Sequence, residues 1–168
     1  METQKDIRIR TYQQGDPSLV CYFYYKLFEQ QYHFNGTVEK YFIQGMGELF
    51  DCPGGSQLWV AVKDERIVGS IAIVRKGDHA AQLRWFGVST EVQGMGIGSR
   101  LMETAMAYCR EKHYTDVILW TISILQSARH LYGKHGFHMT ETKPNREWTD
   151  HELTEEKWEY HAAQPRRQ

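Results

Sequence analysis

Three glycines, Gly94, Gly96 and Gly98, stand within five residues and lead directly into a segment with helical spacing of apolar residues. Each glycine adds backbone entropy that folding must remove, so this clustering indicates a need for bare backbone. The amides of the first helical turn have no intrahelical partners, and the helix dipole adds positive potential there. This helix start is therefore predicted to bind an anion such as a phosphate group.

Two familiar phosphate loops fit this segment poorly. A Walker loop requires Gly-Lys-Ser/Thr, and no lysine occurs between Lys76 and Lys112. A dinucleotide-binding fingerprint requires G-x-G-x-x-G, and Ser99 stands where the third glycine belongs. Asp116, about 20 residues further on, keeps that alternative open. A structural turn that binds nothing is the other alternative.

Three histidines, His130, His135 and His138, have a spacing that occurs in metal sites. Two of them flank an expected helix end, and no carboxylate or thiol joins them. Solvated or hydrogen-bonded histidines explain this pattern better than metal ligands do, so no metal is predicted.

The composition is that of an ordinary globular domain. The chain has 168 residues, of which 41% are apolar and 24% charged, and its net charge of −1 predicts no binding to nucleic acid or to a membrane surface. The N-terminal segment lacks the apolar run of a signal peptide. Cys21, Cys52 and Cys109 form no CxxC motif, which favours three reduced thiols and a cytoplasmic location.

Hydrophobic periodicity predicts the elements that position these residues. The order is one strand, two helices, a meander of three strands, a helix–strand–helix segment and two closing strands. Leu58, Val60 and Val62 line one face of the first meander strand, and the run "DVILWTI" is typical of a strand covered on both faces. Asp16 is the expected N-cap of the first helix. We expect an α/β (α+β) fold, with one domain over residues 1–162 and a polar tail over 163–168.

Two motifs resemble hallmarks of the GNAT-type N-acetyltransferases. Gln93-Gly94-Met95-Gly96-Ile97-Gly98 matches the signature Q/R-x-x-G-x-G/A, and "SARHLYGKHGF" resembles A-x-x-L-Y-x-x-x-G-F. The matching residues of the second motif are Ala128, Leu131, Tyr132, Gly136 and Phe137. The resemblance runs from Ile7 to about Tyr160. The segment "LWTISILQSARHLYGKHGF" is most similar to the acetyltransferase half of proteins that also carry a MarR-type DNA-binding domain; that domain is not in this sequence, and we expect no DNA binding.

The resemblance implies a mixed, mostly antiparallel sheet of six to seven strands with about four helices, and acetyl-coenzyme A as co-substrate. The fourth and fifth strands are expected to splay apart, which lets the Val88 N–H meet the thioester carbonyl. Tyr132 is the expected general acid, because a phenol with an ordinary pKa near 10 is protonated at neutral pH. The implied cofactor-binding residues are Phe86, Val88, Gln93, Gly94, Met95, Gly96, Ile97, Gly98, Ser99, Ser123 and Ala128.

The chain departs from the family at the asparagine that holds the pantetheine arm. Ile122 and Leu125 stand at the two positions where relatives have it, and Ser123 or Gln126 are the candidate substitutes. This loss favours, as the alternative function, a non-catalytic module that binds acyl-coenzyme A. Arg129 and Lys134 either neutralise coenzyme A phosphates or form a solvated helix face.

The acceptor is expected to be a primary amine of a small molecule or peptide. In the family the first helix and the following loop roof the acceptor pocket, which makes Tyr32 and Phe34 the expected substrate contacts. Gln31 supplies no charge, so aromatic faces and hydrogen bonds should hold the amine. A homodimer is an open alternative. The general base stays unassigned among Glu29, His33, Glu91 and His138.

Overall fold

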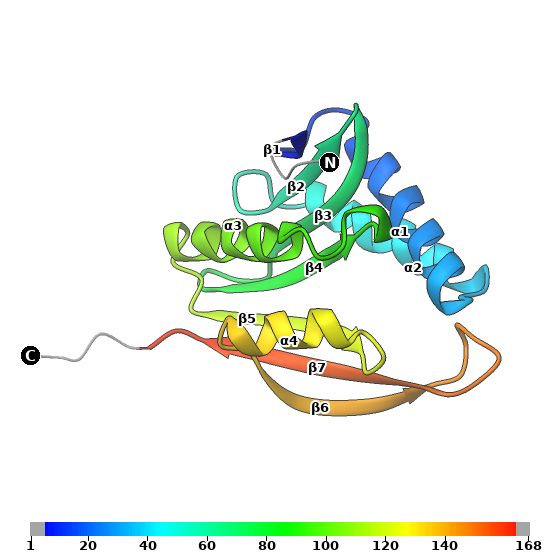
Figure 1. Cartoon of the computed structure of the whole chain (residues 1–168). Coiled ribbons are helices and arrows are strands. Elements are labelled where there is room, and N and C mark those ends of the chain that lie inside the picture. Colours follow the sequence, from blue (N-terminus) through cyan, green and yellow to red (C-terminus); the bar gives the residue numbers. More distant parts are fainter. Residues whose placement is uncertain (1–5, 164–168) are drawn as a thin grey trace, which may run out of the picture.

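The computed structural model describes residues 6–163, within which seven strands and four α-helices follow the expected order (Figure 1). Apart from residue 163, the predicted polar tail lies outside this range. The strands are β1 (Arg8–Thr11), β2 (Gln57–Lys63), β3 (Arg66–Arg75), β4 (Ala80–Val88), β5 (Asp116–Ile122), β6 (His138–Asn145) and β7 (Leu153–His161). The helices are α1 (Asp16–Tyr32), α2 (Thr37–Gly47), α3 (Ile97–Glu111) and α4 (Gln126–Lys134).

The strands form one sheet in the order β1-β2-β3-β4-β5-β7-β6. Neighbours are antiparallel except β4 and β5, which run parallel and are connected through α3. A parallel pair needs such a crossover, because a tight turn can join only antiparallel strands. The predicted mixed, mostly antiparallel sheet is confirmed.

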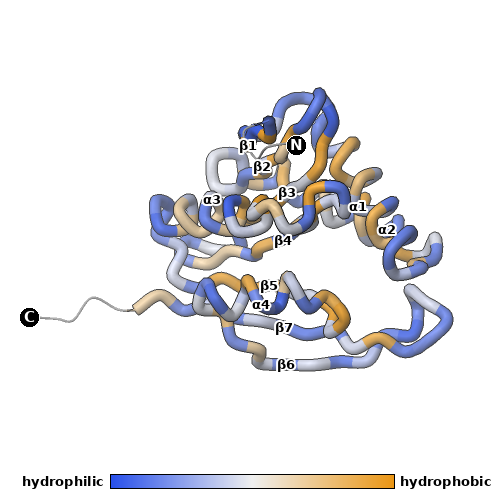
Figure 2. Tube along the Cα trace, viewed as in Figure 1, coloured by the Kyte–Doolittle hydropathy of each residue, from blue (hydrophilic) through white to orange (hydrophobic). Residues whose placement is uncertain are grey.

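Helices cover both faces of this sheet, α1 and α2 on one face and α3 and α4 on the other (Figure 1). Leu58, Val60 and Val62 of β2 share one face of the strand, as predicted, and this face packs toward α1 and α2. Trp59 and Ala61 point the other way and join the core beneath α3. β2 and β3 are therefore buried on both faces, whereas β6 at the sheet edge is mostly exposed. The residues of β6 are mostly polar (Figure 2).

The expected N-cap of α1 is wrong by one residue. Gly15 occupies the cap position with φ 95°, and Asp16 is the first helical residue. The Asp16 carboxylate instead accepts hydrogen bonds from the Gln13 amide at 2.7 Å and the Arg10 guanidinium at 2.6 Å. These bonds turn the carboxylate back toward β1, so the start of the helix is tied to the first strand.

The expectation that β5 is covered on both faces is wrong for most of its length. Val117 and Leu119 are buried beneath the helices, but Ile118 and Trp120 on the other face are only half-buried. The reason is that α1 and α2 lie over β2, β3 and β4 and reach β5 only near Ile122. The exposed part of this face borders the site described below.

β4 and β5 stay paired only at their beginnings. Residues 80–82 of β4 pair with residues 116–118 of β5, and the remaining residues of the two strands have separated. The backbone of β4 beyond Gln82 therefore has β3 on one side and an opening on the other. The splay implied by the family resemblance is present in this structure.

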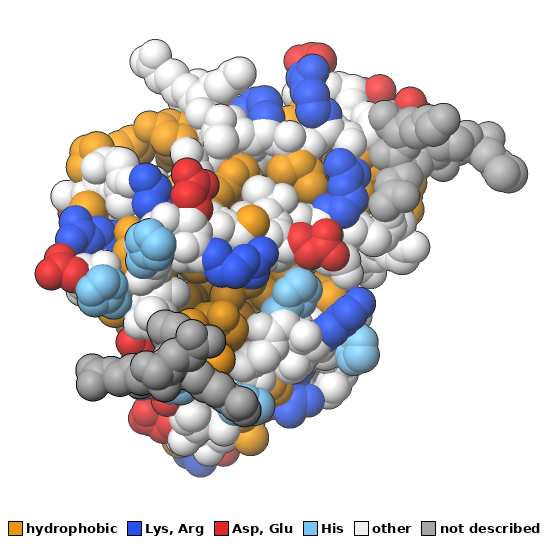
Figure 3. Space-filling model, turned by 90° about the vertical axis from the view of Figure 1, so that its left-hand side faces the viewer, with side chains coloured by type: hydrophobic (Ala, Val, Ile, Leu, Met, Phe, Trp, Pro, Cys, Tyr) orange, Lys and Arg blue, Asp and Glu red, His pale blue; other side chains and the backbone are white. Residues whose placement is uncertain are grey.

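The surface adds two observations on possible partners. On the face that Figure 3 shows, acidic and basic side chains are interspersed, and several histidines lie among them. None of the helices within residues 6–163 is both long and apolar enough to cross a bilayer.

Candidate functional site

The glycine segment forms the turn between β4 and α3. A short 3-10 helix (Thr90–Val92) follows β4, and Gln93 is extended. Gly94 and Gly96 then adopt left-handed backbone with φ 78° and 77°, and Gly96 is the N-cap of α3 without any capping side-chain bond. Left-handed backbone favours glycine, which accounts for two of the three glycines. The amides of Ile97, Gly98 and Ser99 in the first turn of α3 are thus available to an anion.

Gly98 is needed for a different reason. It has ordinary helical backbone, but a Cβ there would lie 3.1 Å from Leu131 Cδ1 and 3.5 Å from the Phe86 ring. Its missing side chain therefore lets α3 pack closely on α4 and β4. Gln93, Gly94 and Gly96 are exposed, so the turn is open to solvent.

The Val88 amide faces the opening between the strands. Val88 is paired with Gly69, and its neighbour Ser89 donates its N–H to the Val68 carbonyl at 2.8 Å. In an antiparallel ladder successive residues alternate the side to which they direct N–H and C=O. The Val88 N–H therefore points away from β3, toward the side that β5 has left.

Tyr132 of α4 lies at this same opening. Its side chain is buried, with ring centroids of Phe86 at 5.9 Å and Trp158 at 6.1 Å. Burial raises the pKa of the Tyr132 phenol above its ordinary value, because the phenolate would lose its hydration. The phenol is therefore protonated at neutral pH and can act as a proton donor.

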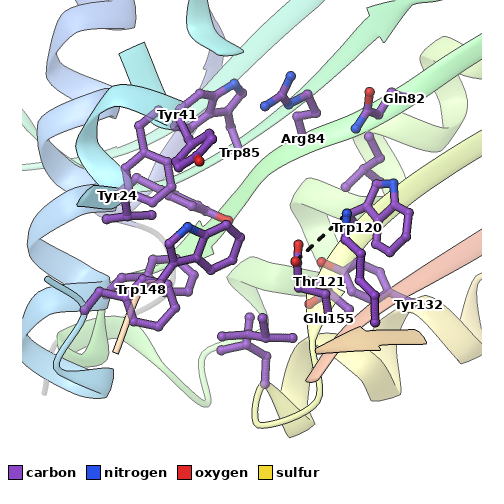
Figure 4. Close-up of a pocket in the computed structure, with 18 residues that line it drawn as sticks. Tyr24, Tyr41, Gln82, Arg84, Trp85, Trp120, Thr121, Tyr132, Trp148 and Glu155 are labelled. Carbon is purple, nitrogen blue, oxygen red and sulfur yellow. Dashed lines mark ion pairs between the residues drawn. The ribbon is translucent and has the colours of Figure 1, made fainter. Parts of the chain in front are cut away.

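A pocket of about 310 Å³ extends from Tyr132 through the opening to the opposite face of the sheet. Tyr132 and Thr121 reach it from the α4 side, and the α1–α2 segment forms its far wall (Figure 4). It is lined by Tyr24, Phe28, Phe34, Val38, Tyr41, Phe42, Gln82, Leu83, Arg84, Trp85, Trp120, Thr121, Ile122, Leu125, Tyr132, Lys143, Trp148 and Glu155.

A bulge in β4 shapes this pocket. Ser70 pairs with Gly87 and Ala72 with Arg84, which leaves two β4 residues opposite Ile71. Trp85, the first of these, has φ 58°, and its carbonyl accepts a hydrogen bond from the Ser70 hydroxyl at 2.6 Å. The bulge turns the Trp85 side chain to the same face as Arg84, whereas strict alternation would place it on the other face.

Two buried indole N–H groups of the pocket walls, those of Trp85 and Trp148, have no hydrogen-bond partner within the described residues. The Thr121 hydroxyl, in contrast, interacts with the Tyr132 phenol. Buried donors are normally paired, since an unpaired one costs about 1–3 kcal/mol. Because both tryptophans line one pocket, a polar ligand there is favoured over a purely structural cavity.

The loop between β6 and β7 closes the pocket over α2. The Trp148 ring lies 5.8 Å from Phe34 and 6.1 Å from Tyr41. The Trp148 carbonyl accepts the Asn35 N–H at 2.8 Å, and the Glu147 carbonyl accepts the Asn35 side chain at 2.8 Å. These bonds join the two halves of the splayed sheet at the end opposite the β4–β5 pairing.

The structure separates the two predicted acceptor contacts. Phe34 is buried in the pocket wall, but Tyr32 is outside the wall and packs on Phe28 with ring centroids 5.6 Å apart. None of the four candidate bases lines the pocket. Glu155 of β7 is the carboxylate among its walls, and sequence reasoning missed it because nothing in the pattern of β7 indicates which strand lies beside it.

The predicted residues after β5 have mixed environments. Ser123 donates its backbone N–H to the Thr154 carbonyl at 2.9 Å, and the Gln126 side chain donates to the Ser123 carbonyl at 3.2 Å. Leu125 and Ile122, at the positions of the missing asparagine, line the pocket instead. Ala128 packs against the core beneath α3.

The two cationic residues predicted on one face of α4, Arg129 and Lys134, also have different environments. Arg129 donates from Nε to the buried Glu156 carboxylate at 2.8 Å, whereas Lys134 is exposed in the last turn of α4. Arg129 thus has a structural partner that competes with any phosphate. Within residues 6–163, no three His, Cys, Asp or Glu side chains converge as a metal site would require.

Comparison with known proteins agrees with this geometry. The model of the acetyltransferase (GNAT) family matches residues 21–137, more than half of the chain. The chain therefore belongs to the GNAT acetyltransferase family. N-acetyltransferase 8B from Homo sapiens is 34% identical over 97 residues, which cover 55% of this chain and 42% of that protein. N-acetylaspartate synthetase from Danio rerio is 33% identical over 86 residues, covering 51% of this chain and 30% of that protein. This chain thus spans less than half the length of these curated relatives.

Solved structures share the fold over nearly the whole chain. An acetyltransferase of the GNAT family from Staphylococcus aureus Mu50 has a TM-score of 0.74 at 17% identity, covering 94% of this chain and 99% of that one. Ard1 from Thermoplasma volcanium has a TM-score of 0.71 at 21% identity, covering 95% and 99%. At this level of identity the likeness shows the fold alone.

Proposed function

We propose that this protein transfers the acetyl group of acetyl-coenzyme A to a primary amine of a small molecule or peptide. The observation that carries the proposal is the pocket that joins Tyr132 to the opposite face of the sheet through the opening between β4 and β5. The free backbone amides in the first turn of α3 support a binding site for acetyl-coenzyme A there, because they suit its pyrophosphate.

In this proposal the amine nitrogen attacks the thioester carbonyl directly. A C–N bond forms and the C–S bond breaks, while the Val88 N–H stabilises the developing oxyanion. Tyr132 gives its proton to the departing thiolate, and the surplus proton of the nitrogen leaves to water and restores the phenol. Burial raises the pKa of Tyr132, which keeps the phenol in the protonated form until the thiolate departs.

The names of the relatives support amine acetylation but not a particular acceptor. N-acetylaspartate synthetase is named for an N-acetylated amino acid, and we extend to this chain only the class of reaction. The finer likeness to MarR-linked acetyltransferases, the homodimer and the single domain over residues 1–162 remain predictions. A cytoplasmic location is also a proposal, supported by three cysteines that form no disulfide.

The decisive experiment measures free thiol released from acetyl-coenzyme A in the presence of a panel of amines. We expect release with at least one amine, and we expect Tyr132→Phe to lower its turnover by about 10- to 1000-fold, the range of one general acid. Coenzyme A should raise the melting temperature of both proteins equally. Unchanged turnover in Tyr132→Phe would remove this residue from the mechanism.

The same assay separates the alternative function. A module that only binds acyl-coenzyme A would show the rise in melting temperature without thiol release for any amine. Ile122 and Leu125 favour this alternative, because apolar side chains replace the asparagine expected at the pantetheine arm.

A further inference from the structure

The bulge of β4 places a cation and an unpaired donor together in the acceptor part of the pocket. The Arg84 guanidinium lies 5.9 Å from the centre of the Trp85 ring system, and both residues line the pocket (Figure 4). Trp85 is 4% exposed, and its indole N–H has no partner within the described residues. An indole N–H can only donate, so a ligand that satisfies it must present an acceptor atom.

Contacts outside the pocket hold the Arg84 guanidinium in position. It donates to Glu48 at 3.1 Å, and Glu48 also pairs with Lys76 at 2.7 Å. A Cβ at Gly45 of α2 would collide with the guanidinium, so glycine leaves the space that it occupies. Arginine has five N–H donors, and the bond to Glu48 leaves others for a second anion.

From this arrangement, and on the basis of the proposed function, we propose that the acceptor amine also carries a carboxylate, which Arg84 and the Trp85 indole N–H bind. The acceptor class is thus a free amino acid. A carboxylate provides two acceptor oxygens, which match one guanidinium and one neutral donor. A polyamine has no group for either of them.

The rest of the pocket suits the remaining parts of such a zwitterion. Glu155 is the carboxylate of the walls, with Lys143 at 4.0 Å, and it lies toward Tyr132 while Arg84 and Trp85 lie toward α1 and α2 (Figure 4). An ammonium group near Glu155 and a carboxylate near Arg84 would therefore complement the charges. Phe28, Phe34 and other aromatic rings form an apolar wall. A volume of about 310 Å³ is near the lower end for ligand pockets and favours a single amino acid with an apolar side chain.

The test compares acceptors that differ only in the carboxylate. L-phenylalanine is paired with phenethylamine and L-tryptophan with tryptamine, and spermidine represents the polyamines. We expect kcat/KM for each amino acid to exceed that for its decarboxylated partner by at least about 10-fold, the effect of a charged hydrogen-bonded pair. Equal or better use of phenethylamine, tryptamine or spermidine would overturn the proposal.

Variants locate the effect. Arg84→Gln should reduce the preference for phenylalanine over phenethylamine toward one, and Trp85→Phe, which keeps a ring but removes the N–H, should reduce it several-fold. Glu48 keeps Lys76 as a partner in Arg84→Gln. The matched control is Arg75→Gln, because Arg75 also forms an ion pair from the sheet but does not line the pocket. A loss of both activities with an unchanged preference would indicate a purely structural role for Arg84 and overturn the proposal.

A binding measurement keeps this inference separate from the proposed function. With coenzyme A present, calorimetry compares N-acetyl-L-phenylalanine with N-phenethylacetamide, which lacks the carboxylate. If the acid binds more tightly than the amide and Arg84→Gln abolishes this difference, the carboxylate site is supported. This holds even if no amine releases thiol, and then only the proposed function fails. Equal binding of the two compounds, together with thiol release from some amine, overturns the carboxylate site and leaves the acetyltransferase intact.

Discussion

Replacing Arg129 with methionine should destabilise the fold by about 3 kcal/mol, because the change leaves the buried carboxylate of Glu156 without its cation. The Glu156 side chain is only 4% exposed, and Arg129 Nε donates to it at 2.8 Å. One donor would remain, the Trp158 indole N–H at 3.2 Å. A single neutral donor does not replace a guanidinium.

The magnitude follows from the exposure of the two partners. Removing one member of a fully buried ion pair costs about 3–5 kcal/mol. The Arg129 side chain is 29% exposed, so water can enter the space that it leaves, and the lower end of that range applies. For a domain of this size 1 kcal/mol shifts the melting temperature by about 2–4 °C, which gives a fall of roughly 6–12 °C.

Equilibrium unfolding in urea measures the loss. Arg146→Met is the matched control, since Arg146 pairs with Glu152 at 2.6 Å but is 81% exposed, and exposed pairs contribute less than about 1 kcal/mol. Adding Glu156→Gln to Arg129→Met should restore part of the stability by removing the stranded charge. A loss no larger than that of Arg146→Met, or a further loss in the double variant, would show that Glu156 is solvated and refute the reasoning.

Three further outcomes are expected. Gly96→Val should fold but lose the rise in melting temperature that coenzyme A produces, because a β-branched residue is disfavoured at φ 77°. The control Gly133→Ala, where a Cβ would meet no other atom, should keep that rise, and a rise retained in Gly96→Val would exclude the loop from cofactor binding. Phe34→Leu should raise the acceptor KM several-fold with the acetyl-coenzyme A KM unchanged, and Tyr32→Ala should have a smaller effect, since Tyr32 packs on Phe28 but does not line the pocket. The reverse order of the two effects would place the acceptor elsewhere. Iodoacetamide at pH 8 should modify Cys52 well before Cys109 in the native protein, because burial raises the pKa of Cys109 to about 12. Mass spectrometry follows the labelling, and equal rates at the two cysteines would contradict the burial of Cys109.

The sequence predicts the fold well because its signals are local. Alternation over Leu58, Val60 and Val62 and helical spacing after Gly98 depend only on nearby residues, and both are confirmed. The end of α4 at Lys134, two residues before Gly136 with its φ of 89°, depends on an equally local signal. Long-range features are different. The half-exposed face of β5 depends on how far α1 and α2 extend over the sheet, which no short pattern records.

The pocket was harder to predict for the same reason. Strict alternation along β4 assigns Trp85 to the face of Leu83, and the bulge opposite Ile71 reverses that assignment. Trp148 and Glu155 come from the β6–β7 segment, and only the strand order brings them to α2 and β5. The glycine turn and Tyr132 belong to contiguous motifs and can be proposed from the sequence, whereas the acceptor walls come from six separate elements and their loops.

The interrupted pairing of β4 and β5 has a consequence for the order of events in catalysis. The sheet separates the α3 turn on one side from most of the acceptor walls on the other, and the opening between β4 and β5 connects the two sides. Under the proposed function the two substrates enter from opposite sides of the sheet and meet at the opening between β4 and β5, so neither must leave before the other arrives. Both are then bound together when the acetyl group moves, and the chain needs no side chain to carry that group between them.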